Sequence, residues 1–365
     1  MASPPRSAAL DLRLLVRPVD AVLDGFLNDR ALDPALRAEA RLPFLVAQLQ
    51  QLIAAGGKRI RPALALVGWH AAGAGGEPRA AHHLAASLEL LHTCALIHDD
   101  VMDRSDTRRG RPTLHRALAR RHRGSPAAAE RFGTGTAILV GDLALIWSDE
   151  LLHTGRPTAG QLAALRPLLL AMRTELILGQ YLDLERTGGR RADAEPGDVE
   201  AALATIRLKT AKYTVERPLQ LGALLAGAGP PVLEALSAYA IPLGEAFQLR
   251  DDLLGVFGDP TATGKPALDD LRDGKATVLV ALALRHADAA QAGQLLAALG
   301  DPDLTEEQAA AVRRTIIATG APRRVQQMIA RRRQRALSSL VRAPLAPAAT
   351  EALRTLADQA VHRLL

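Results

Sequence analysis

The feature that most constrains the fold of this chain is a helical spacing of apolar residues that recurs along its length. The segments with this spacing run about 15–30 residues, longer than an average globular helix, and none shows the alternation of a half-buried strand. Aromatic residues make up only 3% of the chain, which favours helices over sheets. Turn-forming residues interrupt the pattern near 73–78, 122–127, 154–160, 186–198, 227–231, 258–275 and 299–304. No interruption is long enough to separate domains, so we predict one all-α domain over residues 1–365, a bundle of long helices.

The net charge of the chain and the length of its apolar runs indicate which classes of partner it can bind. Asp142, Arg173 and Glu175 interrupt the longest apolar runs, so no stable membrane insertion is expected. The net charge of +6 fits an anionic small molecule, a membrane surface or nucleic acid, but few aromatic rings are present to stack on bases. The basic segment 325–340 is expected to be a solvated helix face, with membrane-surface contact as the alternative. The absence of an apolar signal sequence and the single cysteine, Cys94, predict a cytoplasmic location.

Three aspartates end an almost wholly apolar segment in the stretch "LIHDDVMDRSDTRRGRPTLH", residues 96–115. Asp99 and Asp103 are four residues apart and therefore share one face of a helix, with Asp100 between them. Partly buried carboxylates that repel one another need a cation. Magnesium fits, because it is held by one or two carboxylates together with water and substrate phosphates. For this motif taken alone, a solvated helix turn that bears acids is the alternative.

A second apolar segment, "GEAFQLRDDLLGVFGD", delivers Asp251 and Asp252, with Gln248 one turn earlier. Two acidic helix faces predict a cavity in which metal ions are bridged between them. Each cation near a glycine-containing loop is more simply a surface charge, but together they predict a diphosphate site. We expect Lys58 and Arg61 of "GGKRIRP" to share a helical face. The other candidate groups are Arg108 and Arg109 of "TRRGRP", Lys209 with Thr210 of "RLKTAKYT", and Lys265 and Lys275 of the loop that follows Asp252.

In their order and spacing these motifs resemble the trans-prenyltransferases, or polyprenyl diphosphate synthases, and most of all a bacterial geranylgeranyl diphosphate synthase. The resemblance covers about residues 50–285 and includes "GGKRIRP", the aspartate stretch, "GQYLDLE", "KTAKYT" and the region from "FQLRDD" to "LRDGK". It implies the isoprenoid synthase fold, a helical bundle around a central cavity, and a homodimer. It also implies that isopentenyl diphosphate is condensed head to tail with an allylic diphosphate, assisted by magnesium ions.

By motif position, the resemblance implies that Asp99 and Asp103 bind two magnesium ions and that Asp251 binds a third. Asp100 and Asp252 are implied as supporting carboxylates. The ions and nearby cations would neutralise the diphosphate that leaves when the allylic carbon–oxygen bond breaks.

The resemblance also divides the cations between the two substrates. The allylic diphosphate would be held by Arg108, Lys209 and Lys265. Isopentenyl diphosphate would be held by Lys58, Arg61, His92 and Arg109. The remaining implied roles are oxygen dipoles toward the allylic cation from Thr210 and Gln248, orientation of metal-bound water by Gln180 and Asp183, and closure of the loop over the phosphates by Lys275.

The growing product would extend along the helix that carries Asp99. Cys94 and Ala95 lie one turn before Asp99 and Leu91 lies two turns before it, each turn advancing about 5.4 Å, close to one isoprene unit. Family members that stop at fifteen carbons commonly place bulky aromatic residues at the positions of Cys94 or Ala95. The small residues here predict a twenty-carbon product, geranylgeranyl diphosphate, with a farnesyl or longer product as the alternative.

Gly255 departs from the family pattern, because the second motif reads DDLLG where a third aspartate is usual. Asp251, the direct ligand in the family, remains, so we expect weaker support for the third ion and only a modest effect of Gly255→Asp. The departure leaves a non-catalytic subunit of a heteromeric synthase as an alternative, although such subunits usually lose acids of the first motif. A terpene cyclase needs no second diphosphate site, and the cations expected to hold isopentenyl diphosphate argue against it.

Overall fold

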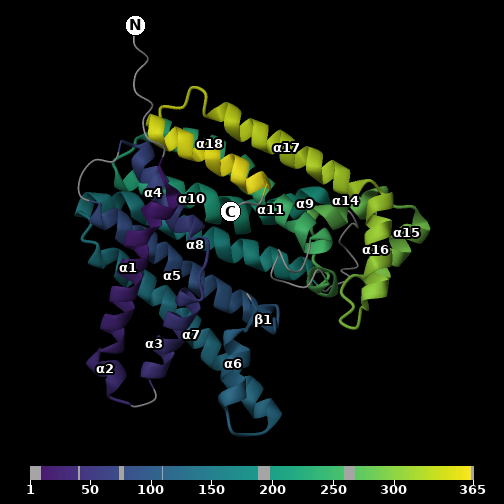
Figure 1. Ribbon diagram of the computed structural model, residues 1–365, viewed down its shortest axis with the longest axis horizontal. Coiled ribbons are helices and arrows are strands. Elements are labelled where there is room, and N and C mark those ends of the chain that lie inside the picture. Colours follow the sequence, from purple (N-terminus) through teal and green to yellow (C-terminus); the bar gives the residue numbers. More distant parts are fainter. Residues whose placement is uncertain are drawn as a thin grey trace. The chain divides into compact units, whose positions relative to one another are not determined.

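The computed structural model describes residues 10–39, 42–73, 78–108, 110–187, 198–258 and 268–362, and this part of the chain is almost wholly helical (Figure 1). Its only strands are β1 (Thr107–Arg108) and β2 (Arg111–Pro112), which pair antiparallel. The predicted all-α fold class is confirmed. Contacts divide the chain into two compact units, the first comprising Met1–Leu165, Pro218–Gly229 and Leu345–Ala352, and the second comprising Arg166–Arg217, Pro230–Pro344 and Leu353–Leu365. A single domain stays a prediction.

The first unit is organised around α5 (Arg79–Met102), which lies beside α7 (Pro126–Thr154) (Figure 1). The helices α1 (Leu12–Ala31) and α4 (Ile60–Ala71) also pack on α5, and α6 (Leu114–Arg121) packs on α7. Buried leucines of α5, Leu84, Leu88 and Leu91, form part of this core, and each contributes about 1.5–3 kcal/mol by leaving water. The shorter helices of this unit are α2 (Pro34–Arg37) and α3 (Pro43–Ala54).

Two glycines let the backbones of α4 and α10 (Arg217–Leu225) touch. A Cβ at Gly222 would lie 1.7 Å from the carbonyl oxygen of Ala65, and a Cβ at Gly68 would lie 1.9 Å from that of Leu219. Any side chain at either position would therefore force the two helices apart. This contact holds α10 in the first unit, next to the helix that follows the "GGKRIRP" motif.

The second unit is organised around α11 (Pro230–Phe257), which packs against α17 (Ala321–Ser339), α14 (Val278–His286) and α9 (Val199–Ile206). Leu249 and Leu253 of α11 pack in one core with Leu282 of α14. The buried hydroxyl of Tyr239 donates to the carbonyl of Leu353 at 2.6 Å, which ties α11 to α18. The remaining bounds are α8 (Ala159–Arg186), α13 (Asp269–Arg272), α15 (Ala289–Ala298), α16 (Glu306–Ala318) and α18 (Pro347–His362).

A π-helix, η1 (Arg207–Glu216), joins α9 to α10 and contains the "KTAKYT" motif. At its end the backbone N–H of Arg217 donates to the carbonyl of Lys212, five residues earlier. Such helices are rare and frequently occur at functional sites, because the wider turn changes which side chains share a face. The segment packs on α11, and Gly244 of α11 leaves room for the backbone of Ala211.

Candidate active site

The first aspartate group lies at the carboxyl end of α5. Asp99 and Asp100 belong to its last turn, and the N–H of Asp103 donates to the carbonyl of Asp99 at 2.8 Å. Asp99 and Asp103 therefore keep the four-residue relation predicted for one helical face, and both are half-buried. Asp100 is only 6% exposed. The backbone dipole is negative at this end of a helix, so these acids depend on cations from elsewhere.

A tight hairpin brings the following residues back toward the end of α5. Arg104 adopts a left-handed backbone with φ of 51°, and Gly110 does so at the tip of the hairpin with φ of 72°. Strands β1 and β2 pair Arg108 with Arg111. The hydroxyl of Thr113 donates to the carbonyl of Ser105 at 2.7 Å, which closes the base of the turn.

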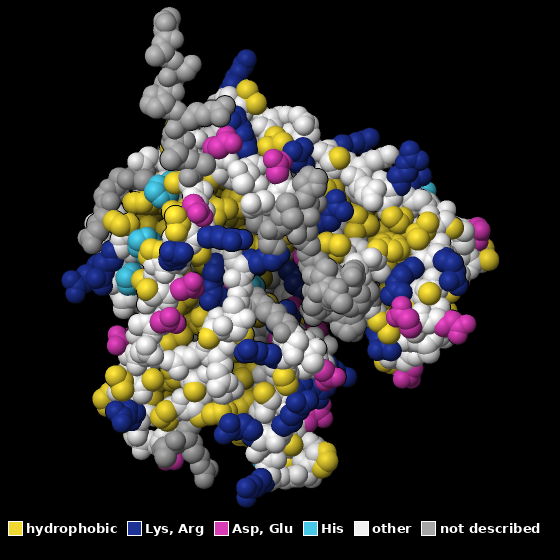
Figure 2. Space-filling model, in the orientation of Figure 1, with side chains coloured by type: hydrophobic (Ala, Val, Ile, Leu, Met, Phe, Trp, Pro, Cys, Tyr) yellow, Lys and Arg dark blue, Asp and Glu magenta, His cyan; other side chains and the backbone are white. Residues whose placement is uncertain are grey.

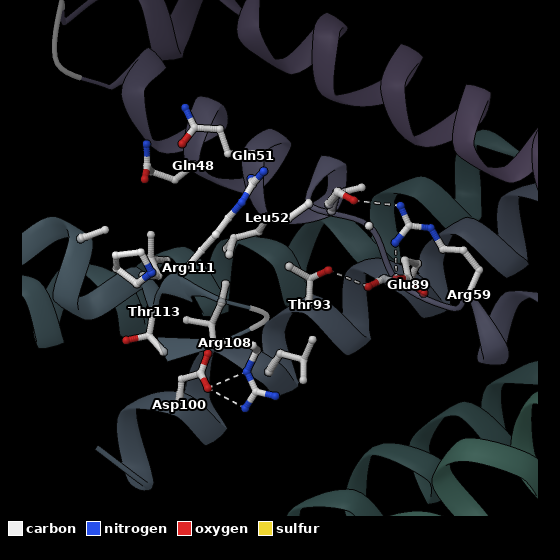
Figure 3. A pocket seen from close by; sticks show the side chains of 18 residues that line it. Gln48, Gln51, Leu52, Arg59, Glu89, Thr93, Asp100, Arg108, Arg111 and Thr113 are labelled. Carbon is white, nitrogen blue, oxygen red and sulfur yellow. Dashed lines mark hydrogen bonds and ion pairs between the residues drawn. The ribbon is translucent and has the colours of Figure 1, made fainter. Parts of the chain in front are cut away.

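Arg108 supplies a cation to the aspartate group (Figure 3). Its Nε donates to Asp100 Oδ1 at 2.6 Å, and its Nη2 lies 3.3 Å from Asp99 Oδ2. Burial alone would lower the pKa of Arg108, but the hydrogen bond to Asp100 and the charges of Asp99 and Asp103 hold that pKa above its usual value. The family resemblance implies that Arg108 holds a substrate phosphate, whereas in this structure it contacts two of the aspartates directly.

Arg59 is a half-buried cation that was not among the residues predicted from the sequence. Its Nη1 donates to Glu89 Oε1 at 2.7 Å, and its Nε donates to Asp20 Oδ1 at 2.9 Å. Together with Thr93 and Asp100, Arg59 and Glu89 line a cavity of the first unit (Figure 3). Burial would lower the pKa of Arg59, but the two carboxylates raise it. No sequence signal distinguishes this arginine from its two cationic neighbours in "GGKRIRP".

The prediction that Lys58 and Arg61 share a helical face is wrong. Arg59 has a left-handed backbone with φ of 47°, which separates Lys58 from α4, whose first residue is Ile60. Lys58 is exposed, whereas Arg61 is half-buried in the first turn of α4 and His92 is half-buried on α5. Arg109 lies outside the described residues.

The second aspartate group lies in the last two turns of α11. The hydroxyl of Thr210 donates to Gln248 Oε1 at 2.8 Å, and Gln248 Nε2 donates to Asp252 Oδ1 at 3.0 Å. The structure thus joins Thr210 of η1 to Gln248 and links both to the buried carboxyl of Asp252. Asp251 beside it is half-buried.

Among the described residues, the buried carboxyl of Asp252 accepts a hydrogen bond from the neutral amide of Gln248, in contrast to Asp100, which binds an arginine. Burial raises the pKa of Asp252 to about 8, opposed by the hydrogen bond from Gln248 and supported by the nearby charges of Asp270, Asp251 and Asp183. A carboxyl group in this setting keeps its proton at neutral pH unless a cation arrives. This is the electrostatic condition that a divalent cation would relieve.

The lysines of this unit pair with neighbouring carboxylates. Lys209 Nζ lies 2.5 Å from Asp183 Oδ2 of α8, and Lys275 Nζ lies 3.0 Å from Asp270 Oδ1. Gln180, also on α8, is half-buried. Lys265 lies outside the described residues.

Asp270 stands where the second motif lacks its third aspartate. A Cβ at Gly255 would lie 1.9 Å from Asp270 Oδ2, so a side chain at position 255 would displace that carboxylate. A carboxylate from α13 thus occupies the space next to Gly255, and weaker support for the third ion stays a prediction. Lys275 holds Asp270 there.

The residues expected to set product length lie along α5. Leu91 and Cys94 are buried, at 4% and 6% exposed, and Ala95 is half-buried. Cys94 Sγ lies 3.8 Å from His98 Nδ1, and His98 Nε2 lies 3.1 Å from the carbonyl oxygen of Ile138 on α7. The part of α5 that carries Cys94 therefore faces α7 within the first unit.

Within the described ranges, no group of three or more histidine, cysteine, aspartate or glutamate side chains is arranged to hold a metal ion by itself. None of the helices described is long and apolar enough to cross a membrane.

Residues 43–316 match the family model described as polyprenyl synthetase. The chain belongs to the polyprenyl synthetase family. The predictions of a prenyl diphosphate synthase and of a prenyltransferase enzyme are thereby confirmed. The match begins in α3 and ends in α16, so it includes both aspartate groups, η1 and the cationic loops of this polyprenyl synthetase.

Several relatives of this polyprenyl synthetase have stated activities. It is 40% identical over 273 residues to the (2E,6E)-farnesyl diphosphate synthase of Mycobacterium tuberculosis, covering 73% of this chain and 68% of that protein. It is 33% identical over 319 residues to the geranylfarnesyl diphosphate synthase of Aeropyrum pernix, covering 86% and 92%. A crystal structure of the geranylgeranyl pyrophosphate synthase of Corynebacterium glutamicum, complexed with isoprenyl diphosphate and magnesium, matches with a TM-score of 0.89 and 40% identity, covering 97% of this chain and 100% of that chain. The products in these three names differ in chain length, but all three proteins are named as prenyl diphosphate synthases.

Proposed function

We propose that this polyprenyl synthetase condenses isopentenyl diphosphate with allylic diphosphates head to tail and releases geranylgeranyl diphosphate. The observation that carries the proposal is the position of both aspartate groups in the last turns of long helices, α5 and α11. Helix dipoles oppose negative charge at such ends. Carboxylates concentrated there are suited to hold cations that in turn hold a diphosphate.

The residues present fit magnesium. Asp99 and Asp103 offer half-buried carboxylates, and Asp252 is a buried carboxyl whose pKa is raised by burial and by the neighbouring acids. Magnesium is usually held by one or two protein carboxylates with water and substrate phosphates, so no complete protein cage is needed. We assign Asp99 and Asp103 to two ions and Asp251 to a third. Bound magnesium supplies charge neutralisation of the diphosphate leaving group.

The chain's own cations complete the diphosphate sites. We assign the allylic diphosphate to Arg108, Lys209 and Lys265, and isopentenyl diphosphate to Lys58, Arg61, His92 and Arg109. Arg108 and Lys209 are held by Asp100 and Asp183, respectively, which fixes their direction before a substrate binds. Lys275, held by Asp270, is assigned to closing the loop that follows α11 and excluding water.

Thr210 and Gln248 are assigned to stabilise the allylic cation. Gln248 donates to Asp252 and accepts from Thr210, so its amide orientation is fixed by two hydrogen bonds. The hydroxyl of Thr210 uses its hydrogen in the bond to Gln248, so its oxygen lone pairs point in the remaining directions. Fixed oxygen dipoles of this kind stabilise positive charge without reorganising during the reaction. Gln180 and Asp183 are assigned to orient water on the metal ions.

Basic side chains on the face of the molecule seen in Figure 2 are spread among acidic and apolar ones. A nucleic-acid-binding protein would gather them into a continuous tract that follows the phosphate backbone. The spread supports a small anionic substrate as the reason for the net charge of +6.

Purified protein incubated with magnesium, isopentenyl diphosphate and each of the dimethylallyl, geranyl and farnesyl primers tests the reaction. We expect a main product of twenty carbons when products are separated by size. A product that stops at fifteen carbons would replace our product assignment with farnesyl diphosphate. No condensation with any primer would overturn the proposed function and favour the non-catalytic subunit.

Product length is assigned to Cys94, Ala95 and Leu91 on α5. Cys94→Phe or Ala95→Phe should shorten the main product to fifteen carbons by filling the channel. Thr93→Val is the matched control, because Thr93 lies on the same helix but lines the cavity of Figure 3. Unchanged products from both phenylalanine variants would show that the limit lies elsewhere.

A homodimer is supported by exposed apolar side chains on two long helices. Leu139 and Ile146 of α7 are 65% and 63% exposed and lie two turns apart on one face. Ile177 and Tyr181 of α8 are 68% and 60% exposed and lie one turn apart. Light scattering should give twice the mass of the 38.7 kDa chain, and Ile146→Glu should reduce it to the mass of one chain. Leu296→Glu on α15 is the control and should leave the mass unchanged.

A further inference from the structure

Glu175 of α8 connects two cations that are five residues apart in the chain. Lys212 Nζ donates to Glu175 Oε1 at 2.6 Å. Arg217 donates through Nε to Glu175 Oε2 at 2.8 Å and through Nη2 to Oε1 at 2.6 Å, a two-bond fork. The side chains of Glu175 and Arg217 are only 15% and 14% exposed, so solvent screens this contact weakly.

The spacing of these cations is that of the π-helix. In an α-helix of 3.6 residues per turn, residues five apart point to different sides. Hydrogen bonding between residues five apart brings them to the same face instead. Lys212 and Arg217 are the two residues joined by that backbone hydrogen bond at the end of η1. Glu175 therefore binds both ends of one π-turn, and an α-helical register would take one cation away from it.

The residues that follow Glu175 on α8 contact the part of η1 that contains Lys209. Gly179, one turn after Glu175, leaves room for the backbone of Lys209, whose N would lie 2.6 Å from a Cβ at position 179. Asp183, one turn further, pairs with Lys209 Nζ. A change of register at Lys212 would rotate the preceding part of the helix, including Lys209 and Thr210, relative to α8 and α11.

We propose that Glu175 is a positioning residue that holds η1 in its π register and thereby directs Lys209 and Thr210. The inference rests on the proposed function for the roles of those two side chains. It assigns to Glu175 no contact with substrate. Its effect reaches the reaction through the backbone of residues 209–217.

Glu175→Gln tests the inference, since it keeps the shape of the side chain but removes the charge. Hydrogen–deuterium exchange of the substrate-free protein should speed up in peptides covering residues 207–217. In steady-state kinetics kcat/KM for the allylic diphosphate should fall about 10–100-fold, because a small misplacement of a reacting group has effects of this size. The KM for isopentenyl diphosphate should stay near its wild-type value. Lys212→Met, which keeps the Arg217 fork, should give a smaller change of the same kind.

Glu245→Gln is the matched control. Glu245 of α11 is also buried and also binds two arginines, Arg207 Nε and Arg332 Nε, both at 2.6 Å. Its ion pair with η1 is made to Arg207, the first residue of that helix, so it does not join the two ends of a π-turn as Glu175 does. Glu245→Gln should lower the melting temperature without the change in allylic kinetics or in exchange at residues 209–217.

Matching exchange and matching kinetic profiles for the two variants would overturn the inference and leave Glu175 as an ordinary stabilising ion pair. A wild-type protein that condenses nothing would instead refute the proposed function. The exchange comparison needs no substrate or turnover, so it would still test whether Glu175 holds the π-helix.

Discussion

The two aspartate groups of this protein share a sequence pattern but differ in how their charge is balanced. At the end of α5, buried Asp100 is bound by the guanidinium of Arg108. At the end of α11, buried Asp252 accepts a hydrogen bond from the amide of Gln248, and burial raises its pKa to about 8. The buried acid of the first group is therefore held by an ion pair, whereas the buried acid of the second group is hydrogen-bonded to a neutral amide. A motif alone does not determine the protonation of its acids.

The largest expected effect is the loss of turnover when a proposed metal ligand, Asp99 or Asp103, is removed. Asp99→Ala or Asp103→Ala should lower kcat by about 10²–10³-fold or more, because the charge of the leaving group would lose its fixed cations. Circular dichroism should show the helical content of the wild type. Magnesium-dependent activity within a few-fold of wild type would remove the first group from the metal site.

Removing the cation should make the first group resemble the second. Arg108→Met removes the guanidinium that binds buried Asp100 and should reduce the free energy of unfolding by about 1–3 kcal/mol, measured in urea. Arg111→Met is the control, since Arg111 lies exposed on the other strand of the hairpin and should cost less than about 0.5 kcal/mol. Equal costs for the two variants would contradict the contrast between the groups.

The raised pKa of Asp252 predicts a pH dependence of stability. Between its ordinary value near 4 and about 8, the folded protein keeps a proton that the unfolded chain loses, so stability falls as pH rises through this window. The slope from this group is at most about 1.4 kcal/mol per pH unit. Unfolding in EDTA should show a steeper decline from pH 5 to 8 for the wild type than for Asp252→Asn. Parallel curves would mean that Asp252 is already ionised in the folded protein from pH 5 to 8.

The smallest expected effect concerns the glycine of the second group. Gly255→Ala and Gly255→Asp should each lower the free energy of unfolding by about 1 kcal/mol, because the new Cβ must displace Asp270 from its contact with Lys275. The sequence alone predicted a modest change in activity for Gly255→Asp and no role for Asp270. Gly255→Asp combined with Asp270→Gly should recover most of the loss in a urea titration. Additive losses in the double variant would show that Asp270 does not compensate for Gly255.

Helical periodicity and residue order were enough to predict the all-α class, the ends of α7 near 154 and of α10 near 227, and the aspartate faces. These properties depend on neighbours within a few turns, which the sequence states directly. The prediction failed at Arg59, where a left-handed residue makes the helix begin at Ile60 and leaves Lys58 outside it. It also missed the hairpin of β1 and β2, whose two-residue strands are too short to produce a pattern.

The sequence by itself determined which residue types this protein offers for chemistry and which of them share a helical face. Only the tertiary structure decided which charges meet, as Arg108 with Asp100, Lys209 with Asp183 and Glu175 with the two cations of the π-turn. Those partners are between eight and 42 residues apart in the chain. Their meeting depends on how whole helices pack, and burial in that packing sets the strength of each contact and the pKa of each acid.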